Sequence, residues 1–137
     1  SDGWLDLYVA NYVSFDLDRN PACYGNSSRR DYCGPAAFEP QPDRLFRNRG
    51  DGTFVDVTTR ALREYKPGPG LGVSIDDLDG NGHVDIYVAN DGKPNQLWLN
   101  QGDGTFVDRG VLLGAAFNVH GQPEAGGRKH ATFCSRK

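Results

Sequence analysis

The sequence predicts an all-β fold, and three observations carry this prediction. The 137 residues include 18 Gly and 8 Pro, which are typical of short strands joined by turns. The apolar stretches are short, and residues 85–90 are apolar on both faces, as in an interior strand of a sheet. No stretch keeps a helical period, and residues 112–117 are expected to form one turn at most.

Two internal repeats set the expected architecture. Residues 42–56 recur as residues 94–108 at an offset of 52, and residues 2–11 recur as residues 81–90 at an offset of 79. Because the two offsets differ by 27, an insertion lies at about residues 12–41 of the first copy. The insertion interrupts the first repeat without replacing any part of it.

The insertion contains Cys23 and Cys33, ten residues apart in a stretch rich in Asn, Ser, Arg and Pro. We expect a disulfide between them, because a bridge would order a long loop that has little core of its own. Two free surface thiols are the alternative, and Cys134 has no predicted partner. A disulfide suits an oxidising compartment, so we expect a secreted protein that is extracellular, periplasmic or held at the cell surface.

Each repeat is expected to supply four short strands. In the second copy they are predicted at residues 70–75, 85–90, 97–99 and 105–107. The last two form a hairpin, because Gly104 at the end of the Asp-Gly loop can take a positive φ without a Cβ clash. Four strands in about 50 residues are typical of a β-propeller blade.

We therefore expect about two four-stranded antiparallel blades in an incomplete ring. Residues 1–58 are assigned to a partial first blade and residues 59–109 to a second blade. Residues 110–137 are assigned to the start of a third repeat, with an irregular tail over 127–137. A ring needs at least four blades, so the end sheets would have open edges. Because the chain begins inside a repeat, we expect a fragment whose neighbours are the remaining blades of a longer protein.

The loop at residues 77–85 predicts the binding of one Ca²⁺. Ca²⁺ takes six to eight oxygen ligands, and side-chain oxygens occur here at loop positions 1, 3, 5 and 9. Gly82 at position 6 permits a sharp turn, which would direct the carbonyl at position 7 toward the ion. The predicted ligands are Asp77, Asp79, Asn81, the carbonyl of His83, and Asp85.

Two other interpretations of this loop can be considered. An EF-hand is excluded, because position 12 is Val88 in a predicted strand rather than a bidentate Glu. An acidic turn that binds no ion remains the alternative. The first repeat keeps only the end of an equivalent loop, with Asp2 and Asp6, and we expect that half-loop to bind metal weakly or not at all.

These motifs resemble the VCBS and FG-GAP repeats, which are the calcium-loop blades of integrin-α-type β-propellers. The Cys-containing insertion followed by residues 42–48 is similar, more narrowly, to the ASPIC/UnbV and cartilage-acidic-protein-like branch. The resemblance covers residues 1 to about 126. It implies an extracellular or periplasmic, calcium-stabilised propeller used for adhesion or ligand binding, and it names no ligand.

We predict that the chain is not an enzyme. It contains no Gly-x-Ser-x-Gly elbow, no His-Glu-x-x-His pair and no Cys-His-Asp arrangement. Besides an adhesion module, a non-catalytic fragment of a carbohydrate-active extracellular enzyme and a purely structural repeat stay open. A net charge of −3 gives no reason to expect nucleic acid as a partner, and no apolar run is long enough for membrane insertion.

The expected partner is therefore a protein or a carbohydrate. Trp4, Trp98, Tyr24 and Tyr32 are candidates for a surface on which sugar rings stack. Trp98 alternates with two Leu residues, so core packing suits it equally well.

Overall fold

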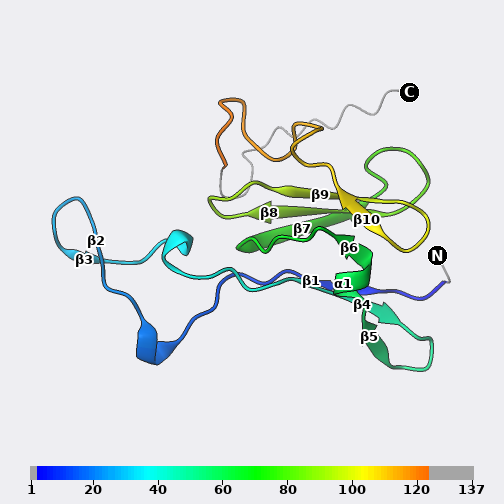
Figure 1. Cartoon of the computed structure of the whole chain (residues 1–137), viewed down its shortest axis with the longest axis horizontal. Helices are drawn as coiled ribbons and strands as arrows, with labels where there is room; N and C mark the ends of the chain where they lie inside the picture. The colour runs from blue at the N-terminus through cyan, green and yellow to red at the C-terminus, as the bar shows by residue number, and fades with distance from the viewer. Residues whose placement is uncertain (1–2, 124–137) are drawn as a thin grey trace.

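A computed structural model describes residues 3–123, so Asp2, the predicted tail and Cys134 lie outside the described residues. The fold is mostly β, with several small sheets and little helix (Figure 1), which confirms the all-β prediction. Within this range no helix is both long and apolar enough to cross a membrane.

Three strands of the first repeat form an antiparallel sheet in the order β1-β4-β5. The strands are β1 (Leu7–Val9), β4 (Arg44–Asn48) and β5 (Phe54–Asp56). Leu7 lies opposite Phe46, and Asn48 lies opposite Phe54. β1 and β4 are neighbours in space although the whole insertion separates them in sequence, as the two repeat offsets predict.

The second repeat forms a five-stranded sheet in the order β6-β10-β9-β8-β7. Its strands are β6 (Leu62–Arg63), β7 (Gly70–Asp76), β8 (Asp85–Asn90), β9 (Gln96–Asn100) and β10 (Phe106–Asp108). Strands β7 to β10 are antiparallel neighbours at the predicted places. The sheet has one strand more than the four predicted. The additional strand is β6, which comes from the connection between the repeats and pairs in parallel with β10.

A short helix, α1 (Thr58–Ala61), lies just before β6 and is not predicted from the sequence. Four residues are too few to show a helical period. The second repeat has a similar turn, in which the Leu113 amide donates to the Arg109 carbonyl at 2.9 Å. That turn lies slightly before the one expected at residues 112–117.

The insertion extends away from both sheets, at the left of Figure 1. Its elements are η1 (Leu17–Arg19), β2 (Cys23–Tyr24), β3 (Arg30–Asp31) and η2 (Pro35–Ala37), with β2 and β3 paired antiparallel. The predicted disulfide between Cys23 and Cys33 is present, with Cα atoms 5.2 Å apart. The bridge therefore closes the small β2–β3 hairpin within the insertion.

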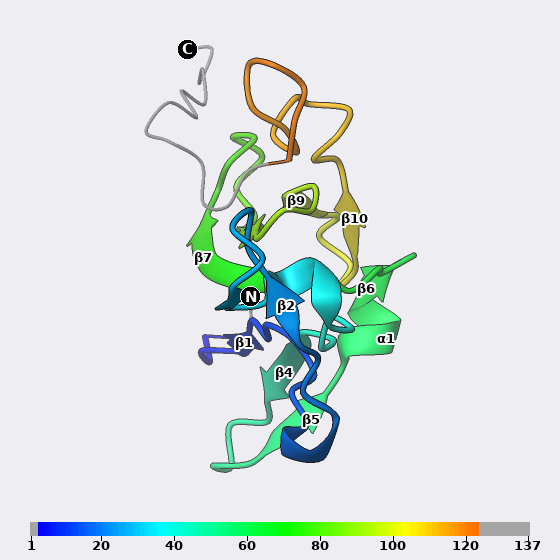
Figure 2. The same cartoon turned by 90° about the vertical axis from the view of Figure 1, so that its left-hand side faces the viewer.

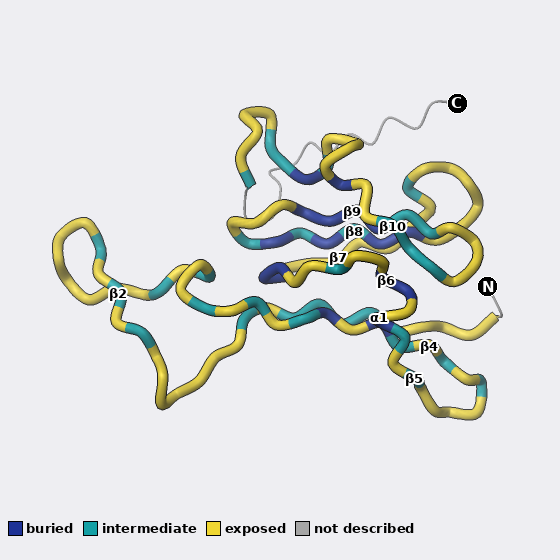
Figure 3. Tube along the Cα trace, in the orientation of Figure 1, coloured by how far each residue is buried: buried dark blue, intermediate teal, exposed yellow. Residues whose placement is uncertain are grey.

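The hydrophobic core lies between the two sheets, and both repeats contribute to it. Its buried members are Leu45, Ala61, Leu62, Ile86, Val88 and Trp98, with Tyr8, Val57, Tyr65 and Phe106 packed against them. Figure 3 shows that the buried positions concentrate in β8, β9 and the connection between the repeats. Figure 2 shows the three-stranded sheet beneath the five-stranded one, with α1 and β6 at the side where they meet.

A buried carboxylate, Asp43, lies just before β4 and links the three-stranded sheet to the connection between the repeats. It accepts the Tyr8 hydroxyl at 2.7 Å and the Asn11 amide at 2.8 Å, and its own amide donates to the Tyr65 hydroxyl at 2.6 Å. Burial raises the pKa of Asp43 above its ordinary value, and the hydrogen bonds offset only part of that effect. Desolvation by burial likewise raises the pKa of Tyr65, to about 12.

Candidate metal centre

The acidic loop joins β7, an edge strand of the five-stranded sheet, to its neighbour β8. Asp76 and Asp85 are the last paired residues of these strands, so the ladder itself closes the base of the loop. Asp85 is the first residue of β8 and is completely buried, whereas Asp77 and Asp79 are exposed. The loop therefore combines one fixed carboxylate with two that face solvent.

The Asp77 carboxylate organises the turn. Oδ1 accepts the amides of Gly80 at 2.9 Å and Asn81 at 3.0 Å, and Oδ2 accepts the amide of Gly82 at 2.9 Å. Gly80 and Gly82 have φ values of 80° and 85°, in the left-handed region that glycine takes without strain. Two glycines thus allow three backbone donors to converge on one side chain.

Asp79 and Asn81 form a second small network. The Asn81 amide donates to Asp79 Oδ1, and the Asn81 side-chain nitrogen donates to Asp79 Oδ2, both at 3.1 Å. The Asn81 side-chain oxygen accepts the His83 amide at 2.7 Å. A carbonyl oxygen has two lone pairs, so this bond leaves Asn81 with acceptor capacity for a further partner.

Asp85 is held by two backbone amides from different segments. Oδ2 accepts the Leu78 amide at 2.9 Å, and Oδ1 accepts the Asn100 amide at 2.8 Å. The Asn100 side chain also donates to the Val84 carbonyl at 3.0 Å. Among the described residues, no salt bridge involves this buried carboxylate. A buried charge without a cation is costly, so its environment favours a positive ligand.

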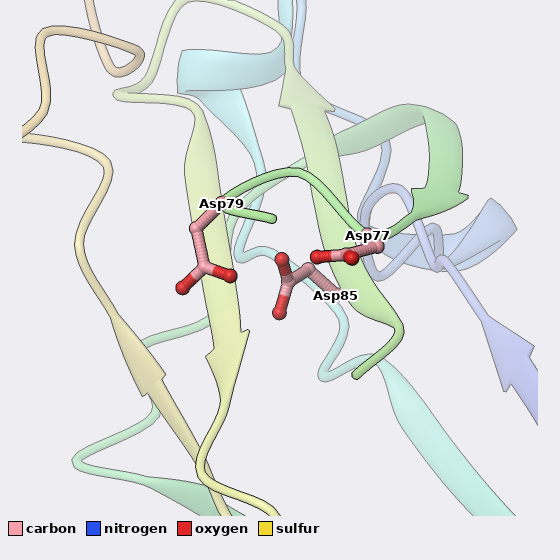
Figure 4. A group of neighbouring side chains, drawn as sticks. All are labelled: Asp77, Asp79 and Asp85. Carbon is pink, nitrogen blue, oxygen red and sulfur yellow. The ribbon is translucent and has the colours of Figure 1, made fainter. Parts of the chain in front are cut away.

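Three carboxylates converge at this loop. One oxygen from each of Asp77, Asp79 and Asp85 lies within 4.8 Å of the others, and Figure 4 shows Asp77 and Asp79 on either side of Asp85. Ca²⁺–O bonds of about 2.3–2.6 Å allow two ligand atoms of one ion to be at most about 5 Å apart. The spacing therefore fits a shared Ca²⁺, and three carboxylates leave a local charge of −1 against it.

The hairpin between β9 and β10 supports the loop from the side, a role that the sequence does not predict. The His83 ring packs over Gly102, where a Cβ atom would lie 2.8 Å from His83 Nε2. Together with the Asn100 contacts, this packing fixes the end of the acidic loop against the hairpin. The internal repeat contains a signal for this role, because Asn100 recurs as Asn48. The sequence motif around these residues, however, predicts only a hairpin.

The first repeat keeps the supporting contacts of this arrangement. The Asn48 amide donates to Asp6 Oδ1 at 2.9 Å, and its side chain donates to the Leu5 carbonyl at 3.1 Å. These contacts are the counterparts of those made by Asn100 to Asp85 and Val84. Asp6 therefore holds the end of the half-loop against the first-repeat hairpin, as Asp85 does in the second repeat.

Two other predicted features also receive a structural explanation. Asp103 Oδ1 accepts both the amide and the hydroxyl of Thr105, and Gly104 has a φ of 82°, which confirms the predicted hairpin turn. These Thr105 hydrogen bonds also lower the pKa of Asp103. Trp98 is completely buried, so it packs in the core and is not part of a sugar-stacking surface.

Comparisons with known proteins agree with the repeat. A model of the FG-GAP-like repeat matches residues 1–88 and again residues 77–126. Cartilage acidic protein 1 of Homo sapiens is 43% identical over 113 residues, which cover 82% of this chain and 14% of that protein. The Mus musculus protein of the same name is 39% identical over 114 residues, with 82% and 15% covered.

The chain thus spans about a seventh of the length of these curated relatives. No solved structure gives a significant match. The expected resemblance to the FG-GAP repeat and to cartilage-acidic-protein-like sequences is confirmed, and it extends over both sheets and the disulfide-closed insertion. The chain belongs to the FG-GAP-like repeat family.

Proposed function

We propose that this chain is a calcium-binding β-propeller-repeat module of a secreted protein and serves adhesion or ligand binding. The convergence of three carboxylates, one of them buried, carries the calcium assignment. The proposed ligands are Asp77, Asp79, Asn81, the His83 carbonyl and Asp85. The disulfide and the relationship to a protein named for cartilage support the extracellular assignment.

In this proposal the ion replaces repulsion among the three carboxylates with coordination. It fixes the turn between β7 and β8, and hence the end of the sheet on which the loop is built. Extracellular calcium modules have a Kd of roughly 10⁻⁴–10⁻³ M. At a free concentration about tenfold above Kd, binding adds roughly 1.4 kcal/mol to the free energy of unfolding.

The test is a calcium titration of the parent chain and of Asp79→Ala. Removing calcium with EDTA is expected to lower the Tm of the parent by about 4 °C, and millimolar Ca²⁺ restores it. Asp79→Ala loses most of this response. The control is Asp51→Asn, a carboxylate of the first-repeat hairpin that binds Thr53, and it keeps the response. An Asp79→Ala protein with the parent's calcium response would exclude the site.

The ligand surface that we propose lies on the insertion. Tyr24 and Tyr32 are exposed there, on the part of the chain that extends farthest from the sheets (Figure 3). Exposed aromatic rings bind sugars or protein side chains by stacking. Replacing both tyrosines with serine is expected to abolish binding to an adhesion partner without lowering the Tm. A purely structural repeat would show no such ligand.

A further inference from the structure

The acidic loop contains the one Asn-Gly pair of the sequence, at Asn81 and Gly82. Such a pair is prone to lose ammonia spontaneously, because glycine has no Cβ atom to hinder the attack of its amide nitrogen on the asparagine side chain. Both residues are exposed to water. Three hydrogen bonds of the pair nevertheless oppose this reaction in the folded loop.

The first hydrogen bond holds the attacking nitrogen. The Gly82 amide donates to Asp77 Oδ2 at 2.9 Å. The nitrogen attacks only after it has lost its proton, and a hydrogen bond to a carboxylate keeps that proton in place. Through Oδ1, the same carboxylate accepts the amides of Gly80 and Asn81. One side chain therefore fixes the backbone on both sides of the bond between Asn81 and Gly82.

The other two hydrogen bonds hold the carbon that is attacked. Asn81 Nδ2 donates to Asp79 Oδ2 at 3.1 Å, and Asn81 Oδ1 accepts the His83 amide at 2.7 Å. The reaction needs Asn81 Cγ aligned with the Gly82 nitrogen at about 3–3.5 Å. Rotation of the side chain toward that nitrogen has to break both bonds. Reaction therefore requires the loop to open locally.

We propose that Asn81 is a deamidation site that the Asp77 carboxylate keeps closed and that local opening of the acidic loop makes reactive. The Gly82 amide nitrogen loses its proton to water and bonds to Asn81 Cγ, and the side-chain nitrogen leaves as ammonia. The product is a cyclic imide. One water molecule then breaks either of the two ring carbon–nitrogen bonds of the Gly82 nitrogen. Overall the chain loses one ammonia and gains one water.

The two products affect the loop differently. Opening at Cγ gives aspartate on an unaltered backbone, and the first repeat already carries Asp2 at the corresponding position. Opening at the backbone carbonyl gives isoaspartate, which routes the chain through the side chain and lengthens the backbone by one atom. The amides of Gly80, Asn81 and Gly82 then no longer converge on Asp77. Isoaspartate thus leaves a permanent chemical trace of an opened loop.

Incubation of the parent chain, Asp77→Ala and Asp76→Ala in mildly alkaline buffer tests this proposal. Peptide mapping by mass spectrometry follows the replacement of the Asn81 side-chain amide by an acid. Asp77→Ala is expected to deamidate roughly tenfold faster than the parent, because it loses three hydrogen bonds that oppose opening. The control, Asp76→Ala, removes a neighbouring carboxylate that accepts the Asp77 amide, and it reacts at the parent rate.

Two further measurements separate loop opening from other causes. All samples contain EDTA, so the result does not depend on whether the loop binds Ca²⁺. Asn26, exposed in the insertion and followed by Ser27, is an internal reference that reacts at one rate in every folded variant. Asp77→Asn keeps the size of the side chain and one acceptor oxygen but loses the acceptor for Gly82, and it is also expected to react faster than the parent.

The parent chain unfolded in urea gives the rate of the unprotected pair. Three results would overturn the proposal. The first is a folded parent in which Asn81 reacts as fast as in urea. The second is Asn81 that stays intact in both Asp77 variants while it reacts in urea. The third is equal acceleration in Asp76→Ala, which would show that loss of a nearby charge, and not loss of the Asp77 hydrogen bonds, sets the rate.

Discussion

Asn100 and Asn48 make the same set of contacts in the two repeats. The Asn100 amide donates to Asp85 and its side chain donates to the Val84 carbonyl. The Asn48 amide donates to Asp6 and its side chain donates to the Leu5 carbonyl. Each side-chain oxygen also accepts the amide two residues later. Among residues 3–123, only the second copy of this arrangement lies beside a complete acidic loop, so the pair separates a structural role from a role in the proposed calcium binding.

Asn100→Ala is expected to weaken calcium binding severalfold and to destabilise the fold. The variant loses two side-chain hydrogen bonds, each contributing about 1 kcal/mol, and it frees the carbonyl that precedes Asp85. Asn48→Ala loses the equivalent bonds in the first repeat, so it lowers the Tm to a similar extent but leaves the calcium Kd unchanged. Isothermal titration calorimetry distinguishes them. Equal Kd values in both variants would show that Asn100 only stabilises the hairpin.

Asp43→Asn is expected to gain stability relative to the parent as the pH rises from about 4, near the ordinary pKa of an aspartate, toward neutral pH. Because burial raises the folded-state pKa of Asp43, its contribution is favourable below the unfolded pKa and is lost as the pH rises through the folded pKa. The amide avoids this loss, and the second repeat already carries Asn95 at this position, where it accepts the Asn90 amide.

A carboxylate with the opposite shift provides the control for Asp43. Hydrogen bonds from Thr58 hold the pKa of Asp56 below its ordinary value, so its contribution is present at neutral pH and is lost on acidification. Asp56→Asn should therefore be less stable than the parent at pH 7, and this deficit should shrink toward low pH. Thermal melts of the three proteins across this range check both slopes, and parallel curves would contradict the assignment.

The individual strands follow from the sequence because their cause is local. The Asp-Gly turns, the apolar pairs beside them and the constant offset place β4, β5 and β8 to β10 within one or two residues. The helix α1 and strand β6 do not follow. Thr58 and Ala61 become helical, and Leu62 becomes extended, because they fill the space between two sheets whose packing only the folded chain specifies.

The insertion is an element that folds against itself. The disulfide closes a loop of about ten residues, for which a chain-entropy contribution of about 2–3 kcal/mol is expected. Because its contacts with the sheets are few, replacing Cys23 and Cys33 with serine is expected to release the insertion alone. Hydrogen exchange should then increase at β2 and β3 and stay slow in β8 and β9. Accelerated exchange in both regions would show that the insertion supports the sheets.

At the scale of the whole molecule, both repeats share one core. Leu62 is 2% exposed and belongs to the buried cluster to which both sheets contribute side chains. Leu62→Ala should therefore cost about 2–5 kcal/mol and lower the stability of both repeats together. Denaturant unfolding followed by tryptophan fluorescence and by far-ultraviolet circular dichroism should give coincident transitions. Two separated transitions would show that the repeats unfold independently.

The acidic loop could be predicted in outline but not in its supports. The spacing of the oxygen-bearing residues predicts that Asp77, Asp79 and Asp85 lie together, since a glycine-containing turn depends on residues close in sequence. The contacts of Asp85 with Asn100 and of His83 with Gly102 join segments 15 or more residues apart. Such contacts depend on how β8 and β9 pair, which periodicity alone does not describe.

Strand β6 lies ahead of Gly70, where the first strand of the second repeat is predicted, so the folded unit begins within the connection between the repeats. A boundary drawn just before Gly70, at the first strand predicted for the second repeat, would remove an edge strand and the buried side chains of Ala61 and Leu62 from the sheet that follows. Anyone dividing this polypeptide for expression, or grafting one repeat onto another, should therefore cut upstream of Val57 and carry the linker along with its successor. Insertions or recombination points placed within this linker would separate β6 from the sheet that it completes.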